Sequence, residues 1–224
     1  MRSRAHLLLT RAQGRNGTLR SALAGLAELS ELPLIAFEGL PHRLPEAVDR
    51  VVISSATVLE FLELDALQQV PVAAVGPRTK AACEAAGLFV DRVPERALSS
   101  VLLRALGDLS GQRVLYPRAE VVPPELEQGL RAAGASLTSL AVYRTVCPAG
   151  ARAAFKRLGP VDGVLLASGS AAIHLHSIGG SGRVFCIGPS TEKVARELGF
   201  EVLGVASSHT SQGLADCVKA WLRD

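Results

Sequence analysis

The sequence predicts an α/β protein built from two similar, doubly wound lobes of the flavodoxin-like kind. Short apolar runs alternate with helix-length segments along all 224 residues, a pattern typical of parallel sheets covered by helices on both faces. Two stretches, VAAVGPRTKAACEAAGLFVDRV (72–93) and VFCIGPSTEKVARELGFEVLGV (184–205), also repeat each other at a distance of 112 residues. A repeat of this length indicates an internal duplication, and two lobes create a cleft that can bind a ligand.

The expected strands are the short apolar runs. Their continuous hydrophobicity predicts strands that are buried on both faces of a parallel sheet. In chain order the runs cover residues 6–10, 51–54, 72–75, 90–93, 114–116, 163–167, 184–187 and 202–205.

The expected helices lie between these runs and include residues 79–86, 124–133 and 191–198. Each of the three is followed by a glycine, Gly87, Gly134 or Gly199, which is the residue that most often ends a helix. Two other segments, LPLIAF (32–37) and LAVYRTV (140–146), occupy similar places in the two halves. The pattern allows them to be sheet strands or crossing connections between the lobes.

Weaker echoes extend the repeat to the rest of the chain. RVVISSATVLEFL (50–62) resembles GVLLASGSAAIHL (163–175), each an apolar strand followed by small hydroxyl residues and an apolar helix-like stretch. LLLTRAQGRNGTLRSAL (7–23) is matched less closely by RVLYPRAEVVPPELEQGL (113–130), which aligns Leu9 with Tyr116 and Arg11 with Arg118.

The composition excludes several classes of function. Aromatic residues make up only 4% of the chain, which argues against recognition of nucleic acid by base stacking. The net charge of +3 comes from interspersed charges, which suits a small polyanion better than a polyphosphate. The N-terminal apolar run is too short for a signal peptide or a membrane span, so we expect a cytoplasmic protein without nucleic-acid or membrane partners. No coiled-coil repeat demands an oligomer, so a monomer is expected.

The cysteines predict buried thiols and no metal site. Cys83, Cys147, Cys186 and Cys217 lie far apart in the sequence, with no Cys-x-x-Cys pair, and each is in or beside an apolar run. Free cysteines in such runs are usually buried and inert.

Two glycine-proline turns are the first candidates for ligand binding. Gly76 and Pro77 follow one expected strand, with Thr79 in the first helical turn, and Gly188, Pro189, Ser190 and Thr191 form a second copy. A helix that starts in this way presents free N–H groups and a positive dipole end to an anion. Capping of the helix by the threonine is the alternative interpretation.

Serine-rich turns follow two other expected strands. Ser54 and Ser55 end one strand, and Ser168, Gly169 and Ser170 end its counterpart. The carboxyl ends of parallel strands are where ligands bind in this architecture, although serine is also a common helix cap. A Gly-x-Ser-x-Gly elbow is absent, which disfavours a serine nucleophile, and no P-loop or Gly-x-Gly-x-x-Gly motif is present.

Three further side chains are candidates for chemistry. Arg11 and Arg118 follow strand ends and could pair with carboxylates, or could be solvated surface residues. Tyr143, one of two tyrosines in the chain, could place its hydroxyl in the cleft as a proton donor. Packing of the Tyr143 ring with its hydroxyl satisfied locally is the alternative.

Seven segments, taken in order, resemble the motif series of the uroporphyrinogen-III synthase family. They are LLLTRAQGRNGTLRSAL, VVISSATVLEFL, VAAVGPRTKAACEAAGL, RVLYPRAE, LAVYRTV, GVLLASGSAAIHL and FCIGPSTEKVARELGFEV. Each motif is loose alone, but their order and spacing are specific, and the resemblance covers essentially the whole chain.

The resemblance implies a cofactor-independent lyase of porphyrin and heme biosynthesis. The family closes the linear tetrapyrrole hydroxymethylbilane to uroporphyrinogen III, with inversion of ring D and loss of water. Much of that chemistry belongs to the substrate, so the protein controls conformation and stabilises developing charge. Hand-over of the substrate from hydroxymethylbilane synthase is a further expectation.

The resemblance also implies two lobes joined by two crossing strands. The first lobe would contain residues 1–35 and 147–224, and the second residues 36–146, with linkers near 32–37 and 140–146. The two repeats would then be completed by exchange of their N-terminal portions.

Individual residues match the family's motifs. The conserved tyrosine of the family matches Tyr143, which would assist departure of the substrate's hydroxyl. The residues that would hold the acetate and propionate arms match Ser55, Thr79, Ser168, Ser170 and Thr191. The alternative function is a non-catalytic two-lobed binding module for a small polycarboxylate or tetrapyrrole, because no acid/base pair is evident in the sequence.

Overall fold

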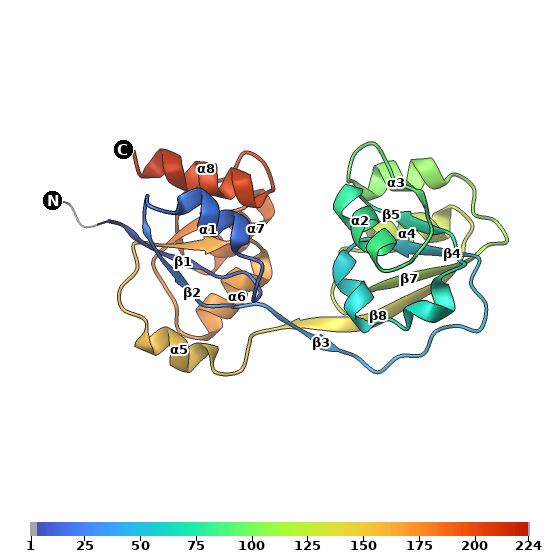
Figure 1. Cartoon of the computed structure of the whole chain (residues 1–224), viewed down its shortest axis with the longest axis horizontal. Coiled ribbons are helices and arrows are strands. Elements are labelled where there is room, and N and C mark those ends of the chain that lie inside the picture. The colour runs from blue at the N-terminus through green and yellow to red at the C-terminus, as the bar shows by residue number, and fades with distance from the viewer. Residues whose placement is uncertain (1–3, 224) are drawn as a thin grey trace. The chain divides into compact units, whose positions relative to one another are not determined.

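The computed structural model describes residues 4–223 and contains two compact units. Unit 1 contains the chain up to Ala36 together with the segment from Thr145 onward, and unit 2 contains Phe37–Arg144. The chain therefore passes between the units twice, and unit 1 is discontinuous in sequence (Figure 1).

Unit 1 contains a five-stranded parallel sheet. The order of its strands is β11-β10-β9-β1-β2, which is the flavodoxin-like order 2-1-3-4-5 when the strands are numbered within the unit. The strands are β1 (His6–Leu9), β2 (Glu28–Glu31), β9 (Gly163–Leu166), β10 (Arg183–Cys186) and β11 (Glu201–Val205).

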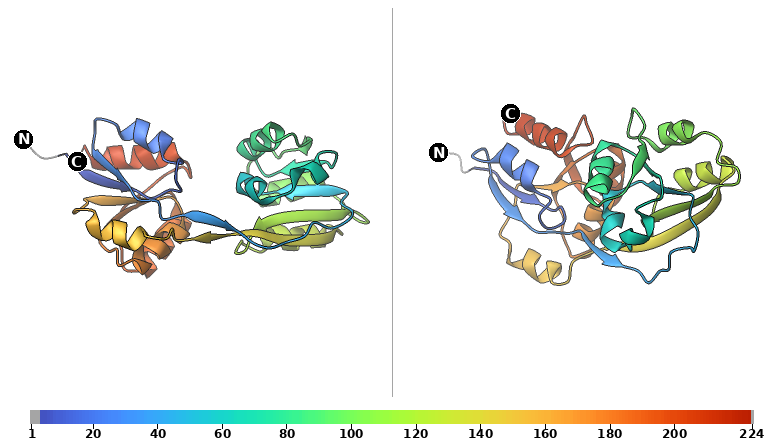
Figure 2. Two further views of the ribbon diagram at one scale, coloured as in Figure 1. Left: turned by 60° about the horizontal axis from the view of Figure 1, so that its bottom comes forward. Right: turned by 45° about the vertical axis from the view of Figure 1, so that its right-hand side comes forward.

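Helices cover both faces of this sheet because its strands are apolar on both sides. Leu7 and Leu9 of β1 lie in a core with α1 (Gly17–Leu23) and α8 (Ser211–Trp221). The intervening Leu8 lies in the opposite core, with α5 (Ala151–Arg157), α6 (Gly169–Ser177) and α7 (Pro189–Glu197). Figure 2 shows α1 and α8, in blue and red, on one side of the sheet and the orange helices on the other. This alternation follows from the period of two in a strand.

Unit 2 repeats the same sheet with one additional strand. The order is β3-β8-β7-β4-β5-β6, and the five strands from β8 to β6 are parallel. Its strands are β3 (Ala36–Gly39), β4 (Arg50–Ile53), β5 (Val72–Ala74), β6 (Val90–Arg92), β7 (Arg113–Ala119) and β8 (Ser136–Val146). Strands β7 and β8 take the places that β1 and β2 have in unit 1. The two sheets confirm the predicted α/β class and duplication.

The helices of unit 2 again lie on two faces. Val51 and Ile53 of β4 pack with α2 (Pro77–Ala85) and with the 3₁₀ helices η1 (Ala56–Phe61) and η2 (Leu64–Leu67). Val52 packs with α3 (Ser99–Leu106) and α4 (Glu125–Ala132) on the other face. The expected glycines Gly87, Gly134 and Gly199 have φ of 80°, 88° and 82°, which confirms them as helix-ending residues.

Some local predictions differ from the structure. The helix-like stretch expected after Ser55 is 3₁₀ and not α-helical, whereas its counterpart in unit 1 is the α-helix α6. Thr57 and Val58 are β-branched and lower the helix propensity, while α6 has small residues at the same places. The LAVYRTV segment is part of the long strand β8, and only the end of LPLIAF enters a strand, β3.

The cysteines are all free thiols, as predicted, but only Cys83 and Cys186 are fully buried. Burial raises the pKa of Cys83 to about 11 and that of Cys186 to about 12, so both are protonated at neutral pH. The prediction of burial was wrong for Cys147 and Cys217, which are half-buried. Cys147 directly follows the end of β8, and Cys217 of α8 lines an open groove.

Candidate functional site

The predicted binding residues of each unit gather at the carboxyl ends of its parallel strands. In unit 1, Arg11 follows β1, Ser168 follows β9 and Gly188 follows β10. In unit 2, Ser54 follows β4 and Gly76 follows β5. Ligands bind at this edge in doubly wound folds, so each unit has its own candidate site.

The turn at the start of α7 matches the sequence expectation closely. Gly188 is the N-cap in extended backbone, and Pro189 occupies the first helical position. Thr191 is only 2% exposed, and among residues 4–223 its hydroxyl has no hydrogen-bond partner, although it is not completely enclosed. Thr191 lies in the first turn of α7, and because a helical Cα–Cβ bond tilts toward the N-terminus, its side chain is directed toward the start of the helix.

The turn at the start of α2 has the same construction. Gly76 is the extended N-cap, Pro77 follows, and Thr79 is 8% exposed. The N–H of Lys80 donates to the Gly76 carbonyl over 2.9 Å, as the N–H of Glu192 donates to the Gly188 carbonyl over 3.0 Å in unit 1.

The serine turns are helix caps. The Ser168 hydroxyl accepts from the N–H of Ala171 over 3.2 Å, and the Ser55 hydroxyl accepts from the N–H of Thr57 over 3.3 Å. Gly169 lets α7 pack closely, because a Cβ there would lie 3.2 Å from Cγ2 of Val194. Ser170 occupies the first turn of α6. Capping uses one acceptor position and leaves each hydroxyl with its own O–H to donate.

The two arginines have hydrogen-bond partners within their own units. The Arg11 guanidinium donates to the hydroxyl of Ser211, the first residue of α8. Arg118 Nε donates to Ser139 over 2.8 Å, and its Nη1 donates to the carbonyls of Ala119 (2.9 Å) and Glu120 (2.8 Å).

A carboxylate is part of the network around Arg118. Glu127 of α4 lies 3.6 Å from Arg118 Nε and accepts from the Ser139 hydroxyl over 2.7 Å. The hydrogen bond from Ser139, followed by that from Arg131, lowers the pKa of Glu127 below its usual range. Part of the guanidinium of Arg118 is therefore engaged inside unit 2.

The aromatic ring of Tyr143 is packed between two other rings. Tyr143 lies on β8 and is 6% exposed. Phe37 meets it edge-on and Phe61 stacks on it, both with ring centroids 5.4 Å away. These contacts fix the ring and hence the position of its hydroxyl.

Two buried polar residues were missed by the sequence reasoning. The hydroxyl of Tyr116, 2% exposed on β7, lies 3.3 Å from Ser54 Oγ. The sequence feature that could have drawn attention to Tyr116 is that the repeat aligns this residue with an aliphatic one, Leu9. Asn16, 1% exposed, donates to Glu31 over 3.0 Å, and its Oδ1 has no partner among residues 4–223. The Asn16 hydrogen bond is the largest contribution that lowers the pKa of Glu31.

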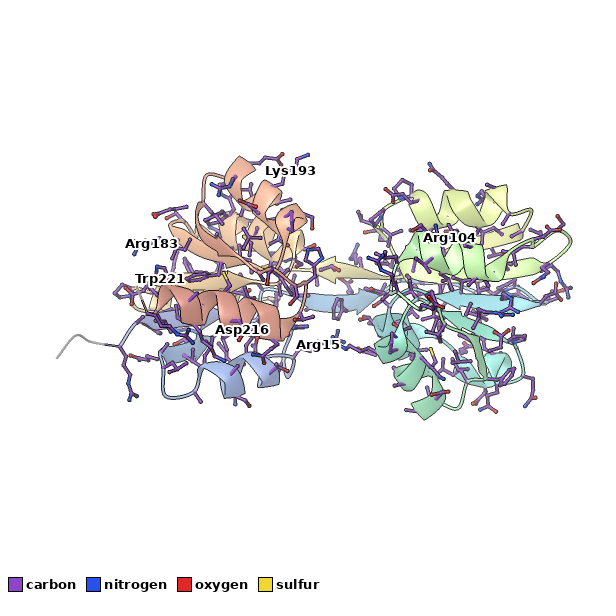
Figure 3. All side chains as sticks on the ribbon, turned by 90° about the horizontal axis from the view of Figure 1, so that it is seen from above. Arg15, Arg104, Arg183, Lys193, Asp216 and Trp221 are labelled. Carbon is purple, nitrogen blue, oxygen red and sulfur yellow. The ribbon has the colours of Figure 1, made fainter. Side chains whose placement is uncertain are left out.

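A groove in unit 1 lies apart from all of these residues. It has a volume of about 470 Å³ and runs between β11 and α8, where Gly204, Asp216, Cys217 and Trp221 contribute to its lining. Figure 3 marks Asp216 and Trp221 along α8. No predicted site residue lines this groove.

Comparison with known proteins decides the family. The sequence model of the family described as Uroporphyrinogen-III synthase HemD matches residues 18–216. The chain belongs to this family. Uroporphyrinogen-III synthases are lyases of porphyrin biosynthesis, and this activity is the function of the chain. The family match does not favour the non-catalytic binding module.

Solved uroporphyrinogen-III synthases have the same fold. The chain is similar to the enzyme of Helicobacter pylori 26695, with 16% identity, a TM-score of 0.73, and coverage of 97% of this chain and 99% of that one. A mutant enzyme of the extremely thermophilic bacterium Thermus thermophilus has 17% identity, a TM-score of 0.58 and coverage of 98% of both chains. No curated protein sequence matches significantly.

The described residues were also compared with the requirements of a metal site and of a membrane-spanning helix. Residues 4–223 contain no group of three histidine, cysteine or carboxylate side chains placed to hold a metal ion. No helix within the same range combines the length and apolarity needed to cross a bilayer.

Proposed function

We propose that this uroporphyrinogen-III synthase holds hydroxymethylbilane by its acetate and propionate carboxylates at the turns described above, and closes it without a cofactor. The observation that carries the proposal is the duplication of the donor turns. Both units place a glycine-proline helix start and a serine cap at the carboxyl ends of their strands. N–H groups and hydroxyls are the donors that carboxylates need.

The proposed reaction begins with departure of the hydroxyl group of the substrate. Its C–O bond breaks, the oxygen leaves as water after gaining a proton, and an azafulvene cation remains. The substituted α-carbon of ring D attacks this cation to give a spiro intermediate. The bond from that carbon to its bridge carbon then breaks, which leaves a second azafulvene cation on ring C. The other α-carbon of ring D bonds to this bridge carbon and loses its proton, so that ring D is inverted and the proton gained by the leaving oxygen is balanced. The protein's contribution is to hold the arms so that the reacting carbons meet, and to stabilise the developing charge.

Tyr143 is the residue proposed to assist departure of the hydroxyl. Its phenol carries a proton that a leaving oxygen can accept. The packing of Phe37 and Phe61 against the ring supports this role, because a proton donor must be held in one place to be effective.

The serine and threonine hydroxyls are proposed to bind the substrate arms. Ser55, Ser168, Ser170, Thr79 and Thr191 keep donors available at the sheet edges of their units. Arg11 and Arg118 are proposed to add positive charge at these edges, where it attracts the carboxylates of the substrate.

An isomer assay tests the function. Hydroxymethylbilane incubated with the protein should give mainly uroporphyrinogen III, measured by chromatography after oxidation. The same substrate without protein should give the spontaneous I isomer. A product that contains only the I isomer in both samples would contradict the activity.

Removal of metal ions by a chelator tests the proposed independence from cofactors as far as metals are concerned. Protein dialysed against a strong chelator and then assayed in its presence should keep its full rate of III-isomer formation. A loss of rate that added metal restores would contradict that part of the proposal.

We further propose a cytoplasmic monomer that receives its substrate directly from hydroxymethylbilane synthase. Light scattering should give the mass of one 23.5 kDa chain. If transfer is direct, the III-isomer yield of the coupled enzymes should stay unchanged when a reagent that captures free hydroxymethylbilane, and does not affect the enzymes, is added. A yield that falls with the trap would show release into solution.

A further inference from the structure

The two glycine-proline turns differ in the residue that covers them. In unit 1 the imidazole of His209 lies against Gly188, so closely that a Cβ there would be 2.5 Å from its Cδ2 and Nε2. In unit 2 the methyl group of Ala97 lies against Gly76, 2.8 Å from where a Cβ would be. Ala97 and His209 are 112 residues apart, the same offset as the repeat.

The backbone around these two residues is equivalent. The N–H of Leu98 donates to the carbonyl of Arg96 over 2.7 Å, and the N–H of Thr210 donates to the carbonyl of Ser208 over 2.8 Å. In both loops the next residue is the N-cap of a helix, α3 or α8. The backbone of the two loops is thus equivalent, and the residue that covers the glycine is a histidine in one and an alanine in the other.

The loop in unit 1 holds the backbone on both sides of His209. Thr210 caps α8 by accepting from the N–H of Gly213 over 3.0 Å, and its hydroxyl lies 3.1 Å from that of Ser208. His209 stands between these two residues. Its ring is exposed, and within residues 4–223 its nitrogens have no hydrogen-bond partner.

We propose that His209 is a substrate-binding residue, whose imidazole donates a hydrogen bond to a substrate carboxylate at the start of α7. This rests on the proposed function, because it takes the Gly188–Thr191 turn as part of the substrate site. An imidazole has an N–H donor when neutral and two when charged. In unit 1 this imidazole adds a donor to the helix start and to the Thr191 hydroxyl, which is 2% exposed and has no partner among residues 4–223. Unit 2 lacks this additional donor, because the side chain of Ala97 cannot form a hydrogen bond.

Steady-state kinetics of three variants at His209 test the proposal. His209→Ala, which copies unit 2, should raise KM for hydroxymethylbilane about tenfold, the effect typical of losing a hydrogen bond to a charged group, with kcat within about twofold. His209→Phe should give the same rise, because it covers Gly188 without a donor. His209→Gln should restore KM to within about threefold, because its amide donates.

The matched control is His176→Ala. His176 is an exposed histidine in the last turn of α6, at the opposite end of that helix from Ser168, and its loss should leave KM unchanged. Melting temperatures of all variants establish that they fold. Formation of uroporphyrinogen III by the wild-type protein establishes the proposed function independently of the result at His209. A wild-type KM for His209→Phe would show that the ring only covers the turn, and an unchanged KM for His209→Ala would equally overturn the proposal.

Discussion

At the scale of single residues, Tyr143 has a structural role through its ring and a proposed chemical role through its hydroxyl. Its ring belongs to the core of unit 2, between Phe37 and Phe61. Removal of the hydroxyl alone leaves those ring contacts in place, because phenylalanine has the same shape. The two roles can therefore be separated by one substitution.

Tyr143→Phe should lower kcat by about 10²-fold or more, the usual range for loss of a positioned proton donor, while product affinity changes by less than about twofold. Turnover is measured by the rate of III-isomer formation, and affinity by titration with uroporphyrinogen III. Phe61→Leu serves as a control for packing and should alter stability more than turnover. An unchanged kcat in Tyr143→Phe would remove the hydroxyl from the mechanism.

The glycines that begin α2 and α7 differ in what surrounds them. Neither has a positive φ in the left-handed region, so neither is required by backbone conformation. At Gly76 an added methyl would meet the Cβ of Ala97, which cannot rotate away. At Gly188 the added methyl would meet the ring of His209, which is exposed and can rotate away from it.

Gly76→Ala should therefore destabilise the protein by about 1 to 3 kcal/mol, the usual cost of overpacking, whereas Gly188→Ala should change the free energy of unfolding by much less. Urea unfolding of the two variants, side by side, measures this difference. Equal effects at the two positions would show that the His209 ring is held as firmly as the Ala97 backbone.

At the scale of elements, an aspartate joins two neighbouring strands in the middle of each sheet, β4 and β7 in unit 2 and β9 and β1 in unit 1. In unit 2 the N–H of Arg113 donates to Asp49 over 2.8 Å, and the N–H of Asp49 donates back to the Arg113 carbonyl over 2.9 Å. In unit 1, Asp162 and His6 make the same reciprocal pair over 2.8 and 2.7 Å. This pair sets the register at the start of neighbouring strands.

Asp49→Asn should weaken the protein in a pH-dependent way. The hydrogen bonds from the Arg113 guanidinium, and then from its N–H, lower the pKa of Asp49 in the folded protein. The stabilisation is thus present above the unfolded pKa of about 4 and is lost as the pH falls below it. Urea unfolding from pH 7 to pH 3 should show a difference between wild type and variant that shrinks with acid. A difference independent of pH would contradict this origin.

The elements that the sequence predicted are those with uniform local signals. Eight apolar runs all became strands, because continuous hydrophobicity reports burial on both faces. Strand β2 was missed, because its sequence ELSE is polar and lies at the edge of the sheet. The contacts of His209 with Gly188 and of Tyr116 with Ser54 join residues distant in the sequence, so no local pattern reports them.

At the scale of the whole molecule, the duplication distributes the chain unequally between the units. Both cores of unit 2 consist of residues between Phe37 and Tyr143. The cores of unit 1 combine residues from both ends of the chain, with β1 between β2 and β9 in the sheet. One unit is therefore complete in a continuous segment and the other is not.

A fragment of residues 36–146 should fold alone, because it contains every strand of the unit 2 sheet and both of its cores. We expect a single cooperative urea transition by circular dichroism and no conversion of hydroxymethylbilane. The fragment 147–224 should show no cooperative transition, because it lacks β1, β2 and α1, which complete the sheet and one core of unit 1. Val52→Asp in the first fragment should abolish its transition, because Val52 is fully buried. Cooperative unfolding of residues 147–224 would show that the N-terminal strands are not required for the fold of unit 1.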